Sequence, residues 1–243
     1  MWRRILKLFM RDVRALGDIL FPRQCNVCGA FLQNEEELIC GACLADMPLT
    51  YMWDYGDNSL ERRIIDKGVY VVAATSLFFY RYEGYSELIR TFKYQGNIDL
   101  GRFLAARLGG VLAQSPRFAS VQAVVPVPLH LFKRFRRGFN QSDIIAEEVA
   151  GALHLQSFPK LLKKRRYTKT QTAFGTGERE GNVKGSFVVN QELAGRLRRQ
   201  GICSILLIDD VLTTGATMAA AIEPLVKAGF RISVATLASV EDL

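Results

Sequence analysis

The chain alternates between two patterns of hydrophobic positions, and these patterns predict alternating strands and helices. Continuous apolar or β-branched runs predict strands at residues 121–127, 161–162, 187–189, 202–208 and 232–237, and a strand or hairpin at 69–82. Apolar positions at helical spacing predict helices at 83–94, 100–113, 141–153 and 217–228, while 47–62 looks like a linker. Such strands alternating with helices are typical of a parallel sheet covered on both faces. We therefore expect a doubly wound α/β fold that binds ligands at the carboxyl ends of its strands.

An amphipathic helix is predicted for residues 1–22, ahead of this fold. Apolar residues such as Ile5 and Phe9 recur at helical spacing, with basic residues such as Arg4 and Arg11 between them. We expect the apolar stripe to pack on the body of the protein, and contact with an anionic membrane surface is the less favoured alternative. The charges interrupt any signal-peptide core, and the chain has no apolar run of about 18 residues. The sequence therefore predicts a cytoplasmic protein.

Cys25, Cys28, Cys40 and Cys43 form two Cys-x-x-Cys pairs, which we assign to a small module spanning residues 23–50. Each pair can turn two thiolates toward one point, and two pairs supply the tetrahedral four-sulfur set that zinc prefers. Four thiolates leave no open position for a substrate, so we expect a structural zinc ion. Two disulfides or four unrelated thiols are the alternative, which a reducing cytoplasm disfavours.

The composition excludes some chemistries and locates the positive charge. With 5 Cys and 2 His in 243 residues, a multi-histidine metal centre is excluded, and a histidine-based triad would depend on His130 or His154. Cys203 lies apart from the other cysteines and is predicted to be a core residue. The net charge of +8 lies mainly in residues 1–24 and 131–184, which carry +4 and +7. Such patches suit phosphate-bearing partners, including nucleic acid and phosphorylated small molecules.

The sharpest functional signal is the run from residue 205 to 217, where an apolar strand ends in two acids before a Thr- and Gly-rich loop and a helix. A helix N-terminus presents unpaired N–H groups to a phosphate, and threonine hydroxyls add donors. Two carboxylates would repel that phosphate but suit the hydroxyls of a ribose. The run therefore predicts a ribose 5-phosphate site, and a plain strand–helix turn capped by threonine is the less favoured alternative. Asp209 and Asp210 are assigned to the diol, and the phosphate-loop residues are Val211, Thr213, Thr214, Gly215, Ala216 and Thr217.

This run resembles the phosphoribosyl pyrophosphate (PRPP) binding motif of type I phosphoribosyltransferases. The resemblance implies a loop that binds pyrophosphate through backbone N–H groups, basic side chains beside that loop, and a hood that closes over the ligand. The loop residues are Val127 and Pro128, the basic residues beside them are Arg134 and Arg137, and the hood residues are Lys164, Gln171 and Arg179.

The same resemblance implies a reaction in which pyrophosphate leaves the ribose. Mg²⁺ would bind together with PRPP, and the basic loop and hood would stabilise the charge on the leaving pyrophosphate. Asp209 and Asp210 are the candidate catalytic residues, although ribose binding is the role that we favour for them. No other general base is evident, and the acceptor is not identified by the sequence.

Together, the cysteine knuckle, the R-R-G-F-N-Q string, the hood and the acidic run resemble the ComF family of competence proteins, from about residue 16 to 237. The resemblance implies a type I phosphoribosyltransferase-like domain over residues 60–243, joined to the N-terminal zinc-binding module. It also implies a cytoplasmic role in natural transformation, or in the uptake or use of external DNA. Single-stranded DNA and the DNA-uptake or helicase machinery would then be partners. We see no N-terminal cysteine nucleophile or glutaminase domain, so glutamine-dependent amine transfer is not expected.

Two functions from different classes follow from these features. The first is a PRPP-dependent phosphoribosyltransferase with an unidentified acceptor. The alternative is a non-catalytic single-stranded DNA-binding factor that keeps the PRPP pocket as a sensor. In that case the zinc knuckle and the basic patches hold the DNA through phosphate contacts, and aromatic residues stack on bases, although we expect most of these rings to be core residues. The rings in question are Phe132, Phe135, Phe139 and Tyr167.

Overall fold

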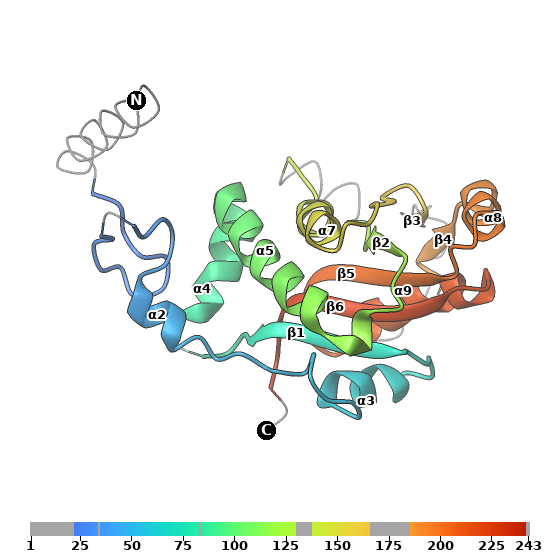
Figure 1. Ribbon diagram of the computed structural model, residues 1–243, viewed down its shortest axis with the longest axis horizontal. Coiled ribbons are helices and arrows are strands. Elements are labelled where there is room, and N and C mark those ends of the chain that lie inside the picture. Colours follow the sequence, from blue (N-terminus) through green and yellow to red (C-terminus); the bar gives the residue numbers. More distant parts are fainter. Residues whose placement is uncertain (1–21, 34, 83, 130–137, 166–184, 242–243) are drawn as a thin grey trace, which may run out of the picture.

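A four-stranded parallel sheet forms the centre of the computed structural model, which describes residues 22–33, 35–82, 84–129, 138–165 and 185–241 (Figure 1). The strands lie in the order β1–β6–β5–β2, and each neighbouring pair is parallel. Their bounds are Ala73–Phe79 for β1, Ala123–Pro126 for β2, Ser204–Leu212 for β5 and Arg231–Ser239 for β6. The parallel α/β class expected from the alternating pattern is confirmed.

Helices cover both faces of the sheet, as Figure 1 shows. One face carries α4 (Tyr85–Arg90), α5 (Ile98–Gln114) and α7 (Gln141–Ala152), and the other carries α3 (Ser59–Ile65) and α9 (Ala216–Lys227). Strand β5 explains the continuous apolar run in the sequence. Leu206 and Ile208 pack in the core with α5 and α7, whereas Ile205 and Leu207 pack with α3 and α9. Because both faces are buried, successive positions in the strand are all apolar.

A second, smaller sheet stands beside the main one. It consists of β3 (Leu162–Lys164) and β4 (Phe187–Val189), which pair antiparallel. Strand β4 coincides with the predicted strand 187–189, whereas β3 shares only Leu162 with the predicted strand 161–162. Helix α8 (Gln191–Arg199) follows and was not predicted, because Ala194 and Leu197 are its only buried residues and its apolar signal is weak. The side-chain oxygen of Asn190 accepts a hydrogen bond from the Leu193 N–H at 3.1 Å and caps this helix.

The cysteine-containing segment, with its short helix α2 (Gly41–Ala45), packs against the same hydrophobic core as α4 and α5. The Tyr85 hydroxyl donates a hydrogen bond to the Cys43 carbonyl at 2.8 Å, and Leu49 forms a β-bridge with Phe78 of β1. Figure 1 shows this segment beside α4 at one end of the molecule, with α8 at the other end. The core on which it rests gives the small cysteine module a fixed support.

Several segments differ from the sequence prediction. The region 69–82 contains one strand, β1, and the helix predicted over 83–94 is α4 followed by a π-helical turn, η1 (Thr91–Gln95). The predicted linker 47–62 holds buried Met52 and Trp53 and the start of α3, and a 3₁₀ turn, η2 (Pro116–Phe118), follows α5. Strand β5 extends beyond residue 208 to Leu212, because its hydrogen-bonded pairing with β6 continues through the two acids.

Two predictions concern membranes and the first residues of the chain. No helix within the described ranges is both long enough and apolar enough to cross a bilayer. The amphipathic helix predicted for residues 1–22 lies outside the described residues, apart from Pro22. Its role therefore stays a prediction from the sequence.

Candidate functional site

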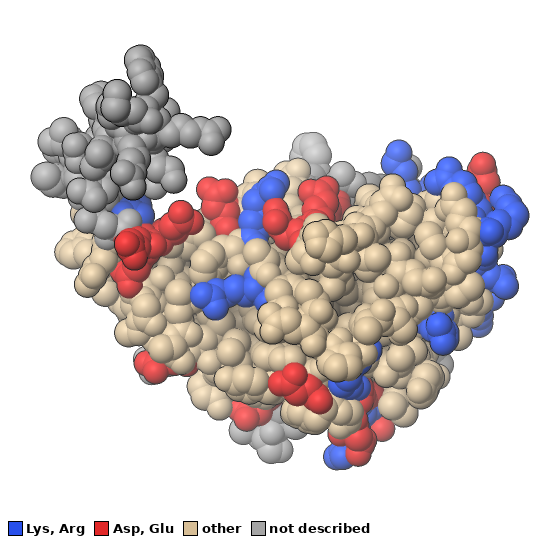
Figure 2. All heavy atoms as spheres, viewed as in Figure 1, with Lys and Arg blue, Asp and Glu red and all other residues tan. Residues whose placement is uncertain are grey.

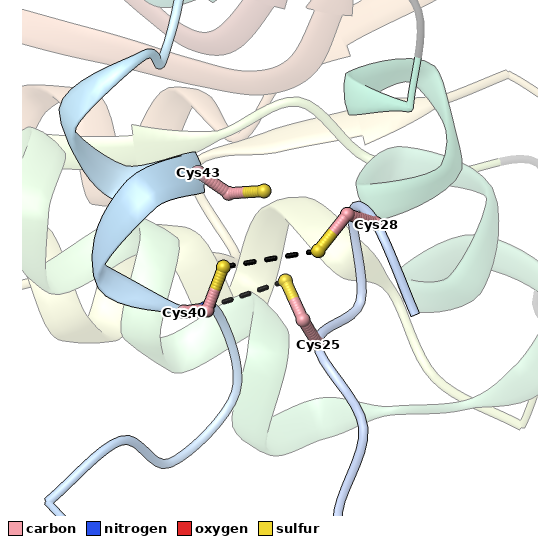
Figure 3. Close-up of side chains that lie close together, drawn as sticks. All are labelled: Cys25, Cys28, Cys40 and Cys43. Carbon is pink, nitrogen blue, oxygen red and sulfur yellow. Dashed lines mark hydrogen bonds between the residues drawn. The ribbon is translucent and has the colours of Figure 1, made fainter. Parts of the chain in front are cut away.

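The fold brings the four cysteines of the two Cys-x-x-Cys pairs to one point, and Figure 3 shows their sulfur atoms converging between α2 and the preceding loop. All four Sγ atoms lie within 4.8 Å of one another, and the Sγ atoms of Cys28 and Cys40 are 3.8 Å apart. Zinc with four ligands at about 2.3 Å in a tetrahedron separates its sulfurs by about 3.8 Å, so the cluster has the dimensions of a Cys₄ zinc site.

The backbone around this cluster is shaped to hold thiolates. Gly29 has a positive φ of 74° and donates its N–H to the Cys25 carbonyl at 2.9 Å, which closes the first knuckle. The Cys25 sulfur accepts N–H groups from Val27 at 3.4 Å and Cys40 at 3.3 Å. Burial of Cys25 opposes ionisation, but backbone hydrogen bonds, these two included, outweigh it and lower its pKa to about 7. A closed set of four thiolates fits structural zinc and leaves no position for a reacting substrate.

A cavity of about 370 Å³ opens at the carboxyl ends of β1, β2 and β5, at the edge where the sequence predicts a ligand. Most of the described residues that the sequence assigns to the ligand line it: Val127, Pro128, Lys164, Asp209, Asp210, Val211, Thr213, Thr214, Gly215 and Thr217. Ala216 was assigned to the phosphate loop and is not among the residues that line the cavity. Four predicted residues lie outside the described part of the chain: Arg134, Arg137, Gln171 and Arg179.

The two acids occupy different environments inside this cavity. Asp209 accepts hydrogen bonds through Oδ1 from the Ser142 hydroxyl at 2.9 Å and from the Asp210 N–H at 2.9 Å. Asp210 forms an ion pair with Lys93, whose Nζ lies 2.9 Å from Oδ1. Burial, followed by repulsion from Asp210, raises the pKa of Asp209 to about 7, against the opposing effects of its two hydrogen bonds and of Lys93. One acid is therefore charge-compensated, and the other is poised to gain or lose a proton near neutral pH.

The Thr- and Gly-rich loop is anchored from behind by α3. Arg63 donates to the Thr213 carbonyl at 2.7 Å and to the Val240 carbonyl at 3.0 Å, which ties the loop to the end of β6. Gly215 stands at the N-cap of α9 with a φ of 77° in the left-handed region, and a Cβ there would lie 3.3 Å from the Arg63 carbonyl oxygen. The N–H groups of the first turn of α9 have no intrahelical acceptor and open toward the cavity end of the helix. The loop can thus receive an anion.

The structure adds cavity residues that the sequence did not single out. Lys93 comes from the π-helical turn η1, more than a hundred residues before the acids, and no local signal connects the two. Ser142 belongs to the first turn of α7, and Asn140 before it donates to the Asp143 carboxylate at 2.8 Å. Asn140 and Gln141 belong to the R-R-G-F-N-Q string and Ser142 directly follows it, so that string was the one signal that could have located them. The lining residues that the sequence did not assign to the ligand are Tyr80, Lys93, Leu129, Asn140, Gln141, Ser142, Leu212 and Met218.

Comparison with known proteins first identifies the N-terminal module. Residues 16–52 match the double zinc ribbon domain family. This stretch contains only the four clustered cysteines, which suffice for one tetrahedral zinc site. The family match and the converging cysteines confirm the zinc-binding module that the cysteine spacing predicts.

Two relatives extend the similarity over most of the chain. Competence protein F of Haemophilus influenzae is 29% identical over 201 residues, which are 82% of this chain and 76% of that protein. DNA utilization protein YhgH of Escherichia coli K12 is 29% identical over 147 residues, which are 59% of this chain and 62% of that protein. The chain thus spans less than two thirds of YhgH. These similarities confirm the resemblance to the ComF family of competence proteins that the sequence motifs indicate.

Among solved structures, the glutamine PRPP amidotransferase of B. subtilis, complexed with ADP and GMP, matches part of the chain. The match covers 60% of this chain and 30% of that one, with 19% identity and a TM-score of 0.39. A score of this size assigns neither a ligand nor a reaction to the present chain.

Proposed function

We propose that the cavity binds a 5-phosphorylated ribose as Mg²⁺–PRPP, and that the protein is a PRPP-dependent phosphoribosyltransferase-type member of the competence and DNA-utilisation machinery. The observation that carries this proposal is the meeting of Asp209 and Asp210 with the Thr- and Gly-rich loop in a single cavity. The 5-phosphate would sit on the N–H groups and hydroxyls of residues 213–217. The acids would accept hydrogen bonds from the ribose hydroxyls.

The remaining cations of the cavity suit the pyrophosphate. Lys93 offsets the charge of Asp210, and Lys164 of β3 lines the same cavity. Val127 and Pro128 begin the loop after β2 and line the cavity. The Val127 N–H already donates to the Ile208 carbonyl at 2.8 Å and proline has no N–H, so the N–H groups that face the pyrophosphate would come from residues after Pro128. Mg²⁺ would supply further positive charge on the leaving group. The contributions of Arg134, Arg137, Gln171 and Arg179 are expected from the sequence alone.

The biological side of the proposal rests on the relatives. One carries the name competence protein and the other DNA utilization protein, and both are similar to this chain at 29% identity. We accordingly place the protein in the uptake or use of external DNA, together with single-stranded DNA and the DNA-uptake machinery. The zinc module would have a structural role, and a cytoplasmic location stays a prediction from the sequence.

Calorimetry with the full-length zinc-loaded protein tests the ligand. Mg²⁺–PRPP should bind more tightly than ribose 5-phosphate or pyrophosphate alone, because it engages both halves of the cavity. Asp209→Asn combined with Asp210→Asn should weaken PRPP binding at least tenfold. The neutral amides repel the phosphates less than the carboxylates do, but they accept weaker hydrogen bonds from the two ribose hydroxyls. Asp54→Asn combined with Asp66→Asn removes two exposed carboxylates elsewhere and serves as the matched control. Equal PRPP affinity in the two double variants would rule out this site.

Transfer and sensing are separated by a second measurement. A transferase releases pyrophosphate from PRPP when the correct acceptor is present, whereas a sensor binds PRPP and leaves it intact. The Lys93–Asp210 ion pair belongs to the PRPP site that both roles would use, so PRPP binding alone does not separate them. Pyrophosphate release, screened against nucleobases, amines and oligonucleotides, therefore decides between the two roles.

A further inference from the structure

Helix α8 lies at the end of the molecule away from the zinc module (Figure 1). A second hollow lies on this helix. Its volume is about 260 Å³, and it is formed where the loop before β3 approaches the helix. Among the described residues it shares none with the lining of the proposed PRPP cavity. The residues that line it are Lys160, Asn190, Glu192, Leu193, Arg196 and Arg199.

The geometry of α8 explains why the cations gather there. Ala194 and Leu197 face the core, so Arg196 and Arg199 are turned toward solvent, one turn apart. Gly195 leaves room for the guanidinium of Arg199, which lies 3.4 Å from the position that a Cβ would occupy. A side chain at 195 would crowd this approach, so the glycine lets Arg199 lie along the helix surface.

The positive charge of this surface is not neutralised by carboxylates of the described residues. Lys160, Arg196 and Arg199 are exposed, and within the described ranges none of them forms an ion pair with a carboxylate. Figure 2 shows lysine and arginine side chains gathered at this end of the molecule. Charged groups that are solvated and uncompensated attract anions from a distance.

We propose that this α8 surface, defined by Lys160, Arg196 and Arg199, binds the phosphate backbone of nucleic acid. Positions 196 and 199 lie one turn apart on the same helix face, where Cβ atoms are about 5–6 Å apart, so the two long side chains can engage neighbouring phosphates. The described residues around the hollow include no aromatic ring, so their contacts would be made to phosphates and not to stacked bases. The choice of nucleic acid among polyanions rests on the proposed function.

Fluorescence anisotropy with a labelled mixed-sequence oligonucleotide and the full-length protein tests this surface across a range of salt concentrations. Arg196→Gln combined with Arg199→Gln should weaken binding about tenfold at low salt. It should also reduce the slope of log K against log salt by about 2, one unit for each lost phosphate contact. Glu192→Gln, which removes the one carboxylate of the hollow, should tighten binding two- to threefold. Lys67→Gln combined with Arg107→Gln, an equal loss of exposed charge elsewhere, should change neither quantity.

The outcomes are distinguishable from those of the PRPP proposal. The α8 variant should bind Mg²⁺–PRPP as the wild type does, because no residue is shared with the other cavity. Equal salt slopes in the α8 and control variants would overturn the α8 assignment, whatever the PRPP result. Displacement of the oligonucleotide by polyglutamate at equal charge concentration would overturn the nucleic-acid assignment in favour of an acidic protein. Displacement by millimolar inorganic phosphate would reduce the surface to a small-anion site and overturn the assignment as well.

Discussion

The Nζ of Lys93 lies 2.9 Å from Oδ1 of Asp210, and the two side chains are only 19% and 13% exposed. The ion pair joins a π-helical turn to the end of the central strand β5, inside the cavity that also holds Asp209. π-Helical turns often occur at functional sites, where the extra residue turns a side chain toward a ligand. Here the turn places a positive charge beside Asp210 in the wall of the cavity.

Replacing this lysine tests its electrostatic role. Lys93→Met should weaken Mg²⁺–PRPP binding about tenfold, or about 1.4 kcal/mol, because the phosphates would meet two carboxylates with one cation fewer. Lys93→Arg should retain most of the affinity. Arg90→Met, an exposed cation one turn earlier that pairs with Glu87, is the control for loss of charge. If Lys93→Met and Arg90→Met bound PRPP equally well, the ion pair would have no role in ligand binding.

The raised pKa of Asp209 makes stability depend on pH. Burial and the nearby Asp210 raise this pKa from 3.8 to about 7. The folded state therefore holds a proton that the unfolded state releases between about pH 4 and pH 7, and this group destabilises the fold increasingly across that window. Asp209→Asn removes the effect, so its stability gain over the wild type should grow from pH 4 to pH 7, level off above, and stay below about 4 kcal/mol.

Urea unfolding at a series of pH values measures this difference. Asp66→Asn makes the same chemical change at an exposed carboxylate at the end of α3 and serves as the control. A stability difference for Asp209→Asn that is independent of pH would contradict a raised pKa. The two variants carry the same chemical change, so burial and the neighbouring acid are what separate them.

The cysteine cluster predicts one zinc ion per chain. Cys28→Ser removes one of four ligands and should lower both the zinc content and the melting temperature, the latter by about 5–10 °C. Cys203→Ser, which lies outside the cluster, should keep one zinc ion and the wild-type melting temperature. Metal analysis and calorimetric melting provide the measurements. Two zinc ions per chain, or full zinc content in Cys28→Ser, would show that the cluster is not a single Cys₄ site.

The backbone of the phosphate loop can be tested with two glycines. Gly215→Ala should destabilise the protein by about 1–2 kcal/mol and weaken PRPP binding, because φ is 77° and the new Cβ would press on the Arg63 carbonyl. Gly110→Ala, inside α5 with nothing within 4 Å, should instead stabilise by about 0.5–1 kcal/mol. Thermal melting and PRPP titration of both variants check these opposite signs. A neutral Gly215→Ala variant would contradict the argument from strain.

Features that depend on residues close together in the sequence could be predicted from it. The zinc ligands lie within 19 consecutive positions, and the acids precede the phosphate loop directly, so spacing alone places them together. The continuous apolar strands identified the parallel sheet, because a strand buried on both faces carries no polar alternation. Helix α8 was not predicted because it is short and mostly polar, with only Ala194 and Leu197 buried.

What the amino-acid order determined is therefore local: the two cysteine knuckles, the strand–loop–helix run and the class of sheet. Tertiary structure alone decided that Lys93 faces Asp210 and that Ser142 donates to Asp209, because parallel strands bring the ends of distant segments to one edge. It also decided that β5 runs through its acids to Leu212. Pairing with β6 determines where that strand ends. Backbone hydrogen bonds do not depend on the polarity of the side chains, so the hydrophobic pattern of the sequence does not show this end.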